Sequence, residues 1–197
     1  MIRIGVTGGI GSGKSVVCRL LEMRGIPVYD SDTAAKELML TDPEIRKGLI
    51  SLLGEDVYKE GYLNKPLLSS FLFSSPQHAA MINHLVHPVV RTDFRRWAEA
   101  RRKCFFIAME SAILIESGFV REVDKVVDVY TPFSLRLKRV MKRDGSTEDQ
   151  VRQRIHSQMD DEQKKKIADI ILMNDEEKSL IVQVENMLQL FSGIGEY

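Results

Sequence analysis

One glycine-rich stretch near the start of the chain constrains the fold more than any other feature. Residues 8–15 read G-x-x-x-x-G-K-S, directly after the apolar run 2–6 and directly before a helical pattern. Glycines at this spacing let the backbone wrap around a phosphate with its N–H groups pointing inward, and the next helix starts with the positive end of its dipole toward the anion. This stretch, the phosphate loop, therefore predicts a nucleoside-triphosphate site.

The motif also predicts which residues contact the nucleotide. Lys14 can reach the β- and γ-phosphates, and the Ser15 hydroxyl can ligate Mg²⁺. A glycine-rich turn that binds nothing is the alternative, and the strand, loop and helix context disfavours it. The expected nucleotide-binding residues of this stretch are Gly8, Gly9, Gly11, Ser12, Gly13, Lys14, Ser15 and Val16.

The charge balance gives no global attraction to a polyanion. The 197-residue chain has 28 Lys and Arg residues and 28 Asp and Glu residues, so we expect neither nucleic acid nor a membrane as a partner. The run 66–90 carries no Asp, Glu, Lys or Arg but is interrupted by Ser, His, Asn and Pro, which argues against a membrane span. The first residues run straight into a strand, with no apolar core of a signal peptide, so we expect a cytoplasmic protein. Oligomeric state is not predicted.

Short apolar runs rich in Ile and Val alternate with helical patterns, which predicts an α/β fold with a parallel sheet buried on both faces. The five expected strands are residues 2–6, 26–29, 104–110, 125–130 and 168–173. The gap between the second and third strands is far longer than a crossover requires. We therefore expect a nucleotide-binding core in residues 1–30, 104–135 and 165–197, a helical substrate-binding insertion in 31–103, and a helical lid in 136–164.

Three carboxylates follow predicted strands. Asp30 and Asp32 come after the second strand, and Glu110 ends the third. Ligands of open α/β sheets lie outside the carboxyl ends of the strands, so these side chains should face the phosphate loop. One aspartate could accept a proton from an attacking hydroxyl, while the other, with Glu110, could order Mg²⁺. The alternatives are a helix N-cap for the aspartates and an ordinary strand-end carboxylate for Glu110.

Histidines and arginines of the insertion have two interpretations. His84 and His87 have a spacing that can ligate a metal, but no third ligand is evident, and zinc sites need three or four. Because His87 precedes Pro88, we expect a helix break instead. The basic residues from Arg91 onward could bind a phosphate-bearing substrate, since arginine forks match phosphate oxygens, or could form a solvated helix face.

Every charged residue between positions 132 and 143 is positive. These residues are Arg136, Lys138, Arg139, Lys142 and Arg143. A glycine loop follows, and Thr147 is a good N-cap for the next helix. Two arginine-rich helices around a glycine loop indicate a hinged flap that could close on phosphates, supply charge to the transition state and exclude water. An ordinary basic hairpin is the alternative.

Taken together, these stretches resemble the dephospho-CoA kinase family over nearly the whole chain. Residues 7–15 resemble its phosphate loop, and Asp30-Ser31-Asp32 resembles its Asp-Ala-Asp motif. His87-Pro88 is similar to its His-Pro step. The resemblance continues in Lys142-Arg143-Asp144-Gly145 with Arg154-Ile155 and Gln158, which match its lid, and in residues 168–174, which match its closing strand and the Asn on the adenine side.

The resemblance implies a P-loop NTPase fold and ATP-dependent phosphorylation of the ribose 3′-hydroxyl of dephospho-CoA, the last step of coenzyme A synthesis, with Mg²⁺ as the metal. It implies Asp32 as the general base and Lys14 on the γ-phosphate. The implied catalytic residues are Asp32, Lys14, Arg139 and Arg143; Asn174 joins the nucleotide-binding residues, Asp32, His87 and Arg91 bind the acceptor, and Ser15, Asp30 and Glu110 serve the metal.

Some positions depart from the family pattern, and two other functions compete with it. The departures are Val16 for Thr, Ser31 for Ala, Ala112 for Pro, and Asp175 and Glu176 where a glycine is common. Shikimate kinases also pair a phosphate loop with Asp-x-Asp, but their Gly-Gly-Gly motif is absent here. Nucleotide switches of the GTPase kind use Asp-x-x-Gly and Asn-Lys-x-Asp, and this sequence contains neither.

Overall fold

A computed structural model describes residues 1–193; the last four residues of the expected core, 194–197, lie outside them. The chain forms two compact units. The first consists of Met1–Tyr29 and the chain from Arg101 onward, and the second is Asp30–Ala100. The first unit therefore contains the phosphate loop, and the second contains Asp30, Asp32 and His87.

The first unit is built on a five-stranded parallel sheet with the strand order β2-β5-β1-β6-β7. Its strands are β1 (Ile2–Thr7), β2 (Val28–Asp30), β5 (Phe106–Glu110), β6 (Lys125–Tyr130) and β7 (Ile170–Met173). All five lie within two residues of the predicted bounds, which confirms the α/β prediction. The strand that leads into the phosphate loop, β1, is central, with Val6 beside Glu110 of β5 and Thr7 beside Asp128 of β6.

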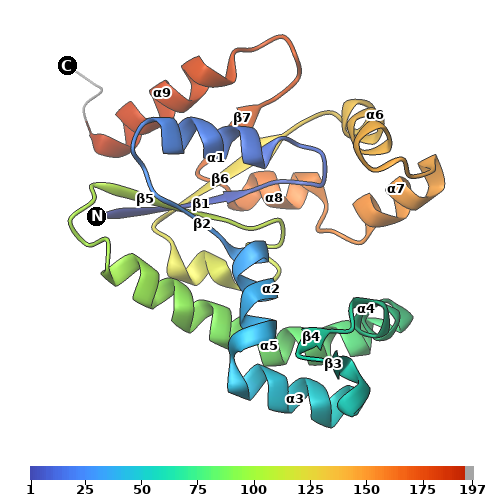
Figure 1. Ribbon diagram of the computed structural model, residues 1–197. Helices are drawn as coiled ribbons and strands as arrows, with labels where there is room; N and C mark the ends of the chain where they lie inside the picture. The colour runs from blue at the N-terminus through green and yellow to red at the C-terminus, as the bar shows by residue number, and fades with distance from the viewer. Residues whose placement is uncertain (194–197) are drawn as a thin grey trace. The chain divides into compact units, whose positions relative to one another are not determined.

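Helices cover both faces of this sheet. α1 (Lys14–Met23) and α9 (Leu180–Ser192) lie side by side on one face, and α8 (Asp161–Ile167) packs against β6 on the other (Figure 1). A short 3₁₀ helix, η2 (Phe119–Glu122), lies between β5 and β6. The core under α1 and α9 is apolar, and its fully buried members include Ile4, Val6, Val17, Leu21, Val127 and Val129. Burial of this apolar surface fixes the strand that carries the phosphate loop.

A helical hairpin completes the first unit. It consists of α6 (Phe133–Asp144) and α7 (Glu148–His156). Gly145 ends α6 in the left-handed region, and Thr147 begins α7 with a capping box, in which its hydroxyl accepts from the Gln150 N–H and the Gln150 side chain accepts from the Thr147 N–H. The predicted N-cap at Thr147 is confirmed.

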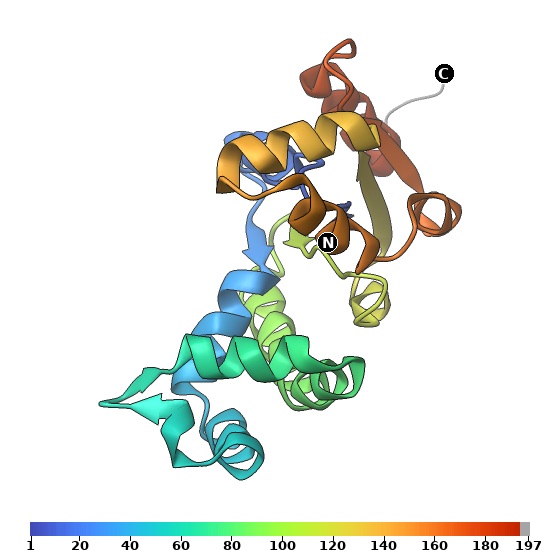
Figure 2. The ribbon, with the colours of Figure 1, turned by 90° about the vertical axis from the view of Figure 1, so that its right-hand side faces the viewer.

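The second unit is largely helical. Its elements are α2 (Ser31–Thr41), α3 (Pro43–Leu53), η1 (Glu55–Val57), β3 (Tyr58–Lys59), β4 (Tyr62–Leu63), α4 (Lys65–Ser74) and α5 (Pro76–Glu99). α5 is the central helix and packs against α2, α3 and α4 (Figure 2). Its buried side chains repeat every four residues, at Ile82, Val86, Val90, Phe94 and Ala98.

The expected helix break at Pro88 is wrong, because α5 continues through this residue. Proline inside a helix removes one backbone hydrogen bond and costs roughly 3 kcal/mol. The buried stripe of α5 and its packing against three helices offset that cost. The Thr92 hydroxyl also donates to the Pro88 carbonyl at 3.0 Å. Tertiary packing thus overrides the local signal.

The uncharged run 66–90 forms parts of α4 and α5. No helix within residues 1–193 has both the length and the apolar character that crossing a membrane requires.

Candidate active site

The phosphate loop leaves the start of α1 open to an anion. Gly8, Gly11 and Gly13 have φ values of 148°, 77° and 95°, which L side chains rarely adopt. At Gly8 a Cβ would also lie 2.5 Å from the Val129 carbonyl oxygen. α1 begins after Gly13 without a side-chain cap. Its first N–H groups and the positive end of its dipole therefore favour a phosphate at this position.

Two polar side chains of the loop fit a bound anion. The buried Ser12 hydroxyl has no hydrogen-bond partner in the described part of the chain, a state that costs roughly 1–3 kcal/mol. The Lys14 ammonium donates to the carbonyl oxygens of Gly8 at 3.0 Å and Gly9 at 3.4 Å, so it already lies over the loop. Ser15 and Val16, in the first turn of α1, are exposed.

Glu110 lies at the end of β5, beside the last residues of β1. The Cys18 thiol of α1 hydrogen-bonds to its carboxylate. Burial, together with the Glu110 charge, raises the pKa of Cys18 far above its ordinary range, and Lys14 lowers it only in part. Cys18 therefore stays protonated and donates to Glu110. Both cysteines, Cys18 and Cys104, are free.

A second carboxylate, Asp128, lies on the other side of β1, beside Thr7. Burial raises the pKa of Asp128 to about 6, although the Lys164 charge acts in the opposite direction. Lys164 of α8 is fully buried, and its Nζ has no hydrogen-bond partner within residues 1–193. Sequence analysis missed both residues, because Asp128 is enclosed in an apolar run and Lys164 in a run of three lysines.

We expect the Asp128→Asn variant to gain stability relative to the parent as pH rises from about 4 to 6. The folded pKa of Asp128, about 6, lies above its ordinary value of 3.8. In this window the folded parent binds more protons than the unfolded chain, so it loses at most ~1.4 kcal/mol per pH unit as pH rises. Asparagine does not titrate. The variant also lacks the attraction between Asp128 and Lys164, which is already contained in the folded pKa of about 6 and therefore adds no separate pH dependence.

Urea unfolding of both proteins across pH 4.5 to 7.5 measures this difference. A difference in unfolding free energy that stays constant with pH would show that the pKa of Asp128 is not raised in the folded state.

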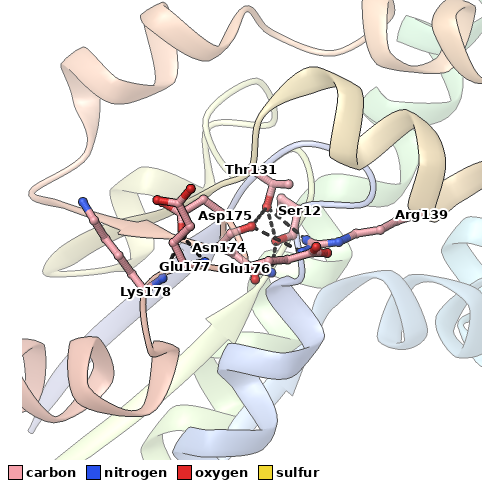
Figure 3. Close-up of polar contacts among 8 residues, drawn as sticks. All are labelled: Ser12, Thr131, Arg139, Asn174, Asp175, Glu176, Glu177 and Lys178. Carbon is pink, nitrogen blue, oxygen red and sulfur yellow. Dashed lines mark hydrogen bonds and ion pairs between the residues drawn. The ribbon is translucent and has the colours of Figure 1, made fainter.

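A polar cluster surrounds the Ser12 carbonyl on the side of β7 (Figure 3). The Asn174 Nδ2 donates to the Ser12 oxygen at 2.7 Å, and the Thr131 hydroxyl lies 2.9 Å from the carbonyl oxygens of Ser12 and Asn174. The Arg139 guanidinium donates to the Thr131 hydroxyl at 3.3 Å and to the Asn174 carbonyl at 3.4 Å. The structure thus brings Ser12, Asn174 and Arg139 together, and adds Thr131, which sequence analysis did not single out.

The departure from glycine after the last strand has a clear structural counterpart. Glu176 has a φ of 71°, in the region that favours glycine, and its Oε1 accepts from Arg139 Nη2 at 3.0 Å (Figure 3). Asp175 shapes the same turn by accepting from the N–H groups of Lys178 at 3.0 Å and Glu177 at 3.1 Å, and these bonds lower its pKa. The turn therefore holds a strained backbone and a carboxylate that fixes Arg139.

Arg143 makes its contacts elsewhere, at the turn between α6 and α7. Its Nε and Nη2 donate to Asp144 at 2.6 and 3.1 Å, and Arg154 Nη1 donates to the same carboxylate at 2.7 Å. These two guanidinium groups hold the pKa of Asp144 well below its usual range. In residues 1–193 the ion pairing of Arg143 is with Asp144, and none of its hydrogen bonds reaches the phosphate loop.

Arg136, of the same positively charged run, lies against Gly9 of the loop. Its side chain is buried, and its Nη2 donates to Asp161 of α8 at 2.6 Å. A Cβ on Gly9 would collide with its Nη1. The sequence pattern could not select Arg136, since Arg136, Arg139 and Arg143 follow one another at helical spacing and carry the same charge.

Asp30 caps α2 in the second unit. Its Oδ1 accepts from the N–H groups of Asp32 and Thr33, each at 3.0 Å, and its Oδ2 accepts from the Thr33 hydroxyl at 2.6 Å. The N-cap interpretation is confirmed for Asp30. Asp32 follows in the first turn of α2, and its side chain is exposed.

His87 and Arg91 lie one turn apart in α5 of the same unit. Burial lowers the pKa of His87, and the Arg91 charge lowers it further, so the imidazole is neutral at pH 7. Among residues 1–193 no group of three or more His, Cys, Asp or Glu side chains could hold a metal ion.

Known proteins resemble this chain over nearly its whole length. A family model described as dephospho-CoA kinase matches residues 2–179. A dephospho-CoA kinase of Bacteroides fragilis is 51% identical over 187 residues, which are 95% of this chain and 91% of that protein. A crystal structure from Thermus thermophilus, 31% identical, has a TM-score of 0.78 and covers 100% of this chain and 98% of its own. A shikimate kinase from Acinetobacter baumannii, solved with shikimate, is 17% identical with a TM-score of 0.56, covers 100% of this chain and 96% of its own, and shares the fold alone.

Proposed function

Because the chain belongs to the dephospho-CoA kinase family, we propose that it transfers the γ-phosphate of ATP to the 3′-hydroxyl of the ribose of dephospho-CoA and releases coenzyme A and ADP. The observation that carries the proposal is the phosphate loop after the central strand, which opens into the uncapped start of α1. Phosphoryl transfer is catalysed mainly by positioning and by stabilising charge, and this loop supports both. Family membership identifies the acceptor.

The first unit would bind the nucleotide. The N–H groups of the loop and of the first turn of α1 hold the triphosphate, and Lys14 moves from the carbonyls of Gly8 and Gly9 to the β- and γ-phosphates. Asn174, whose side chain donates to the Ser12 carbonyl, is proposed to contact the adenine end of the nucleotide. Arg139, held by the Asn174 carbonyl and by Glu176, would steady the charge that moves during transfer.

We propose Mg²⁺ as the metal, with Ser15 and Glu110 as side chains that would hold it and Asp30 acting through water. Mg²⁺ supplies charge neutralisation between the phosphates. Its usual ligands are one or two carboxylates, substrate phosphates and several waters. Ser15, exposed in the first turn of α1, and Glu110, at the end of β5, supply a hydroxyl and a carboxylate oxygen of the kind that this pattern needs.

The second unit, Asp30–Ala100, would bind dephospho-CoA. Asp32 would accept the proton of the 3′-hydroxyl; its support is an exposed carboxylate two residues beyond the strand end and its match to the second Asp of the family motif. His87, neutral at pH 7, and Arg91 would bind the acceptor, with the guanidinium near its diphosphate. The hairpin within 136–164 would serve as the lid, in which Arg143 can act only after it leaves Asp144.

The experiment measures ADP and the mass of the phosphorylated product when ATP, Mg²⁺ and dephospho-CoA are supplied together. We expect ADP and coenzyme A in equal amounts, and little ADP when dephospho-CoA is omitted or replaced by shikimate. ADP release that does not depend on the acceptor would contradict the proposal and would favour a nucleotide hydrolase or switch.

We expect Arg139→Lys to lower turnover by roughly tenfold and to change ATP affinity less, because lysine keeps the charge but loses the planar fork that contacts Thr131, Asn174 and Glu176. Arg143→Lys is the matched comparison on the same helix and should have the smaller effect. Single-turnover rates and ATP binding are measured on both variants. Equal losses in turnover and affinity would show that Arg139 contributes ground-state binding only.

A further inference from the structure

We infer that residue 9 is glycine in order to admit the side chain of Arg136, and that Arg136 is a positioning residue that fixes the phosphate loop from α6. The inference rests on the phosphate loop as the nucleotide site of the proposed function. According to this inference Gly9 accommodates a side chain of the same protein, whereas the motif alone predicts that Gly9 contacts the nucleotide.

Gly9 differs from the other glycines of the loop. Its φ lies outside the left-handed region, so its backbone would accept alanine. The nearest atoms that a Cβ would meet all belong to the Arg136 side chain: Nη1, with which it would collide, Cζ at 3.0 Å and Cδ at 3.6 Å. At Gly8, by contrast, a Cβ would meet the carbonyl of Val129 and the Ser12 hydroxyl. The contact that excludes a side chain at position 9 is therefore made by the Arg136 guanidinium.

Arg136 is held firmly in this place. Its side chain is only 4% exposed, and its Nη2 donates to Asp161 at 2.6 Å. Its buried Nε has no hydrogen-bond partner within residues 1–193. A buried charge is expensive unless it is paired, and removal of one partner of such a pair is strongly destabilising. The guanidinium thus joins three segments of the first unit: the phosphate loop, α6 and α8.

The neighbouring loop residues are fixed by α6 and by the segment that follows α7. A Cβ on Gly11 would lie 2.7 Å from Val140 Cγ2 and 3.0 Å from the Arg136 carbonyl oxygen. The Ile10 N–H donates to Gln158 Oε1 at 2.7 Å, and the Ile10 side chain packs on the apolar cluster that contains Val140. Among these contacts Arg136 alone brings a full positive charge to the loop. Its loss should therefore displace residues 9–11 and reduce the attraction for the triphosphate.

A double-mutant cycle of Gly9→Ala and Arg136→Ala tests this inference. The steady-state kcat and the KM values for ATP and for dephospho-CoA are measured for the parent, both single variants and the double variant. We expect each single variant to lose about 10²-fold in kcat/KM for ATP, with little change in the KM for dephospho-CoA. The double variant should be no worse than the worse single variant, because both changes remove the same contact. Losses that multiply would show that Gly9 is required by the nucleotide, and would overturn the inference.

Two milder variants keep the test decisive if Arg136→Ala does not fold. Arg136→Lys retains the charge without the fork, and Asp161→Asn leaves the contact with Gly9 but weakens the ion pair. We expect both variants to be folded, as checked by their thermal unfolding midpoints, and to lose part of kcat/KM for ATP. Parent-like kinetics in both would overturn the inference. Arg19→Ala serves as the control for charge removal and should match the parent, because Arg19 is exposed on α1 and its ion pair with Glu22 lies at the surface.

Lys14→Ala, assayed in parallel, distinguishes the inference from the function on which it rests. If Lys14→Ala retains its turnover, the phosphate loop is not the nucleotide site and the proposed function fails with it. If Lys14→Ala is inactive while Arg136→Lys and Asp161→Asn behave like the parent, the function stands and only the positioning role of Arg136 is wrong.

Discussion

Lys14→Ala should lower turnover by about 10²–10³-fold, the loss typical of removing one preorganised group that stabilises transition-state charge. In the structure Lys14 Nζ lies over the loop, donating to the carbonyls of Gly8 and Gly9. The triphosphate brings the charge that this ammonium is placed to meet. Because α1 begins at Lys14 and alanine is the best helix former, the variant should fold normally.

The measurement is acceptor-dependent ADP release, with the thermal unfolding midpoint as the check on folding. Lys103→Ala is the matched control in the same unit. Lys103 is exposed and precedes the amino end of β5, while the loop follows the carboxyl end of the parallel strand β1. The control should match the parent. Near-normal turnover of Lys14→Ala would show that the phosphate loop is not part of the catalytic site.

Asp32→Asn should lower turnover by about 10²–10⁴-fold and leave ATP binding almost unchanged, as expected for the loss of a general base. The side chain is exposed in the first turn of α2, and its hydrogen-bonded neighbour Asp30 provides the cap of the helix. The substitution therefore preserves shape and cap and removes only the ability to take a proton. Phosphoryl transfer has a loose transition state, so a loss near the lower end of this range would indicate that Asp32 acts more by positioning.

Asp30→Asn is the matched comparison, because it makes the same chemical change two residues earlier in the sequence. Asparagine can still accept from the N–H groups of Asp32 and Thr33 through its Oδ1, so α2 keeps its cap and only the charge is lost. If Asp30 serves the metal, raising the Mg²⁺ concentration should partly restore Asp30→Asn and should not restore Asp32→Asn. Rescue of Asp32→Asn by Mg²⁺ would show that the two roles are reversed.

The parts of the fold that the sequence predicts well are those set by local pattern and burial. The Ile- and Val-rich runs predicted the positions of all five strands, because a strand buried on both faces is apolar along its whole length. The phosphate-loop motif predicted that α1 begins at Lys14, and the N-cap residue Thr147 predicted the start of α7. The same local reasoning failed at Pro88, where packing along α5 outweighs the missing hydrogen bond.

The parts of the site that the sequence does not predict are contacts between distant segments. Asn174 meets the Ser12 carbonyl across 162 residues, and Lys164 lies near Asp128 although one belongs to a helix and the other to a strand. A helix that carries five positive residues does not indicate which one is buried. Arg136 stands out from the other four because its side chain lies against Gly9, and this contact forms only when the chain is folded.

The protonated thiol beside Glu110 has a consequence for the reactivity of Cys18. A thiolate is a strong nucleophile and metal ligand, whereas a protonated thiol is neither. Burial and the adjacent carboxylate keep Cys18 protonated, so it remains a hydrogen-bond donor. The same environment shields it from electrophiles and oxidants, which react with the thiolate. Cys18, a buried residue of the helix that follows the phosphate loop, is thereby kept unreactive.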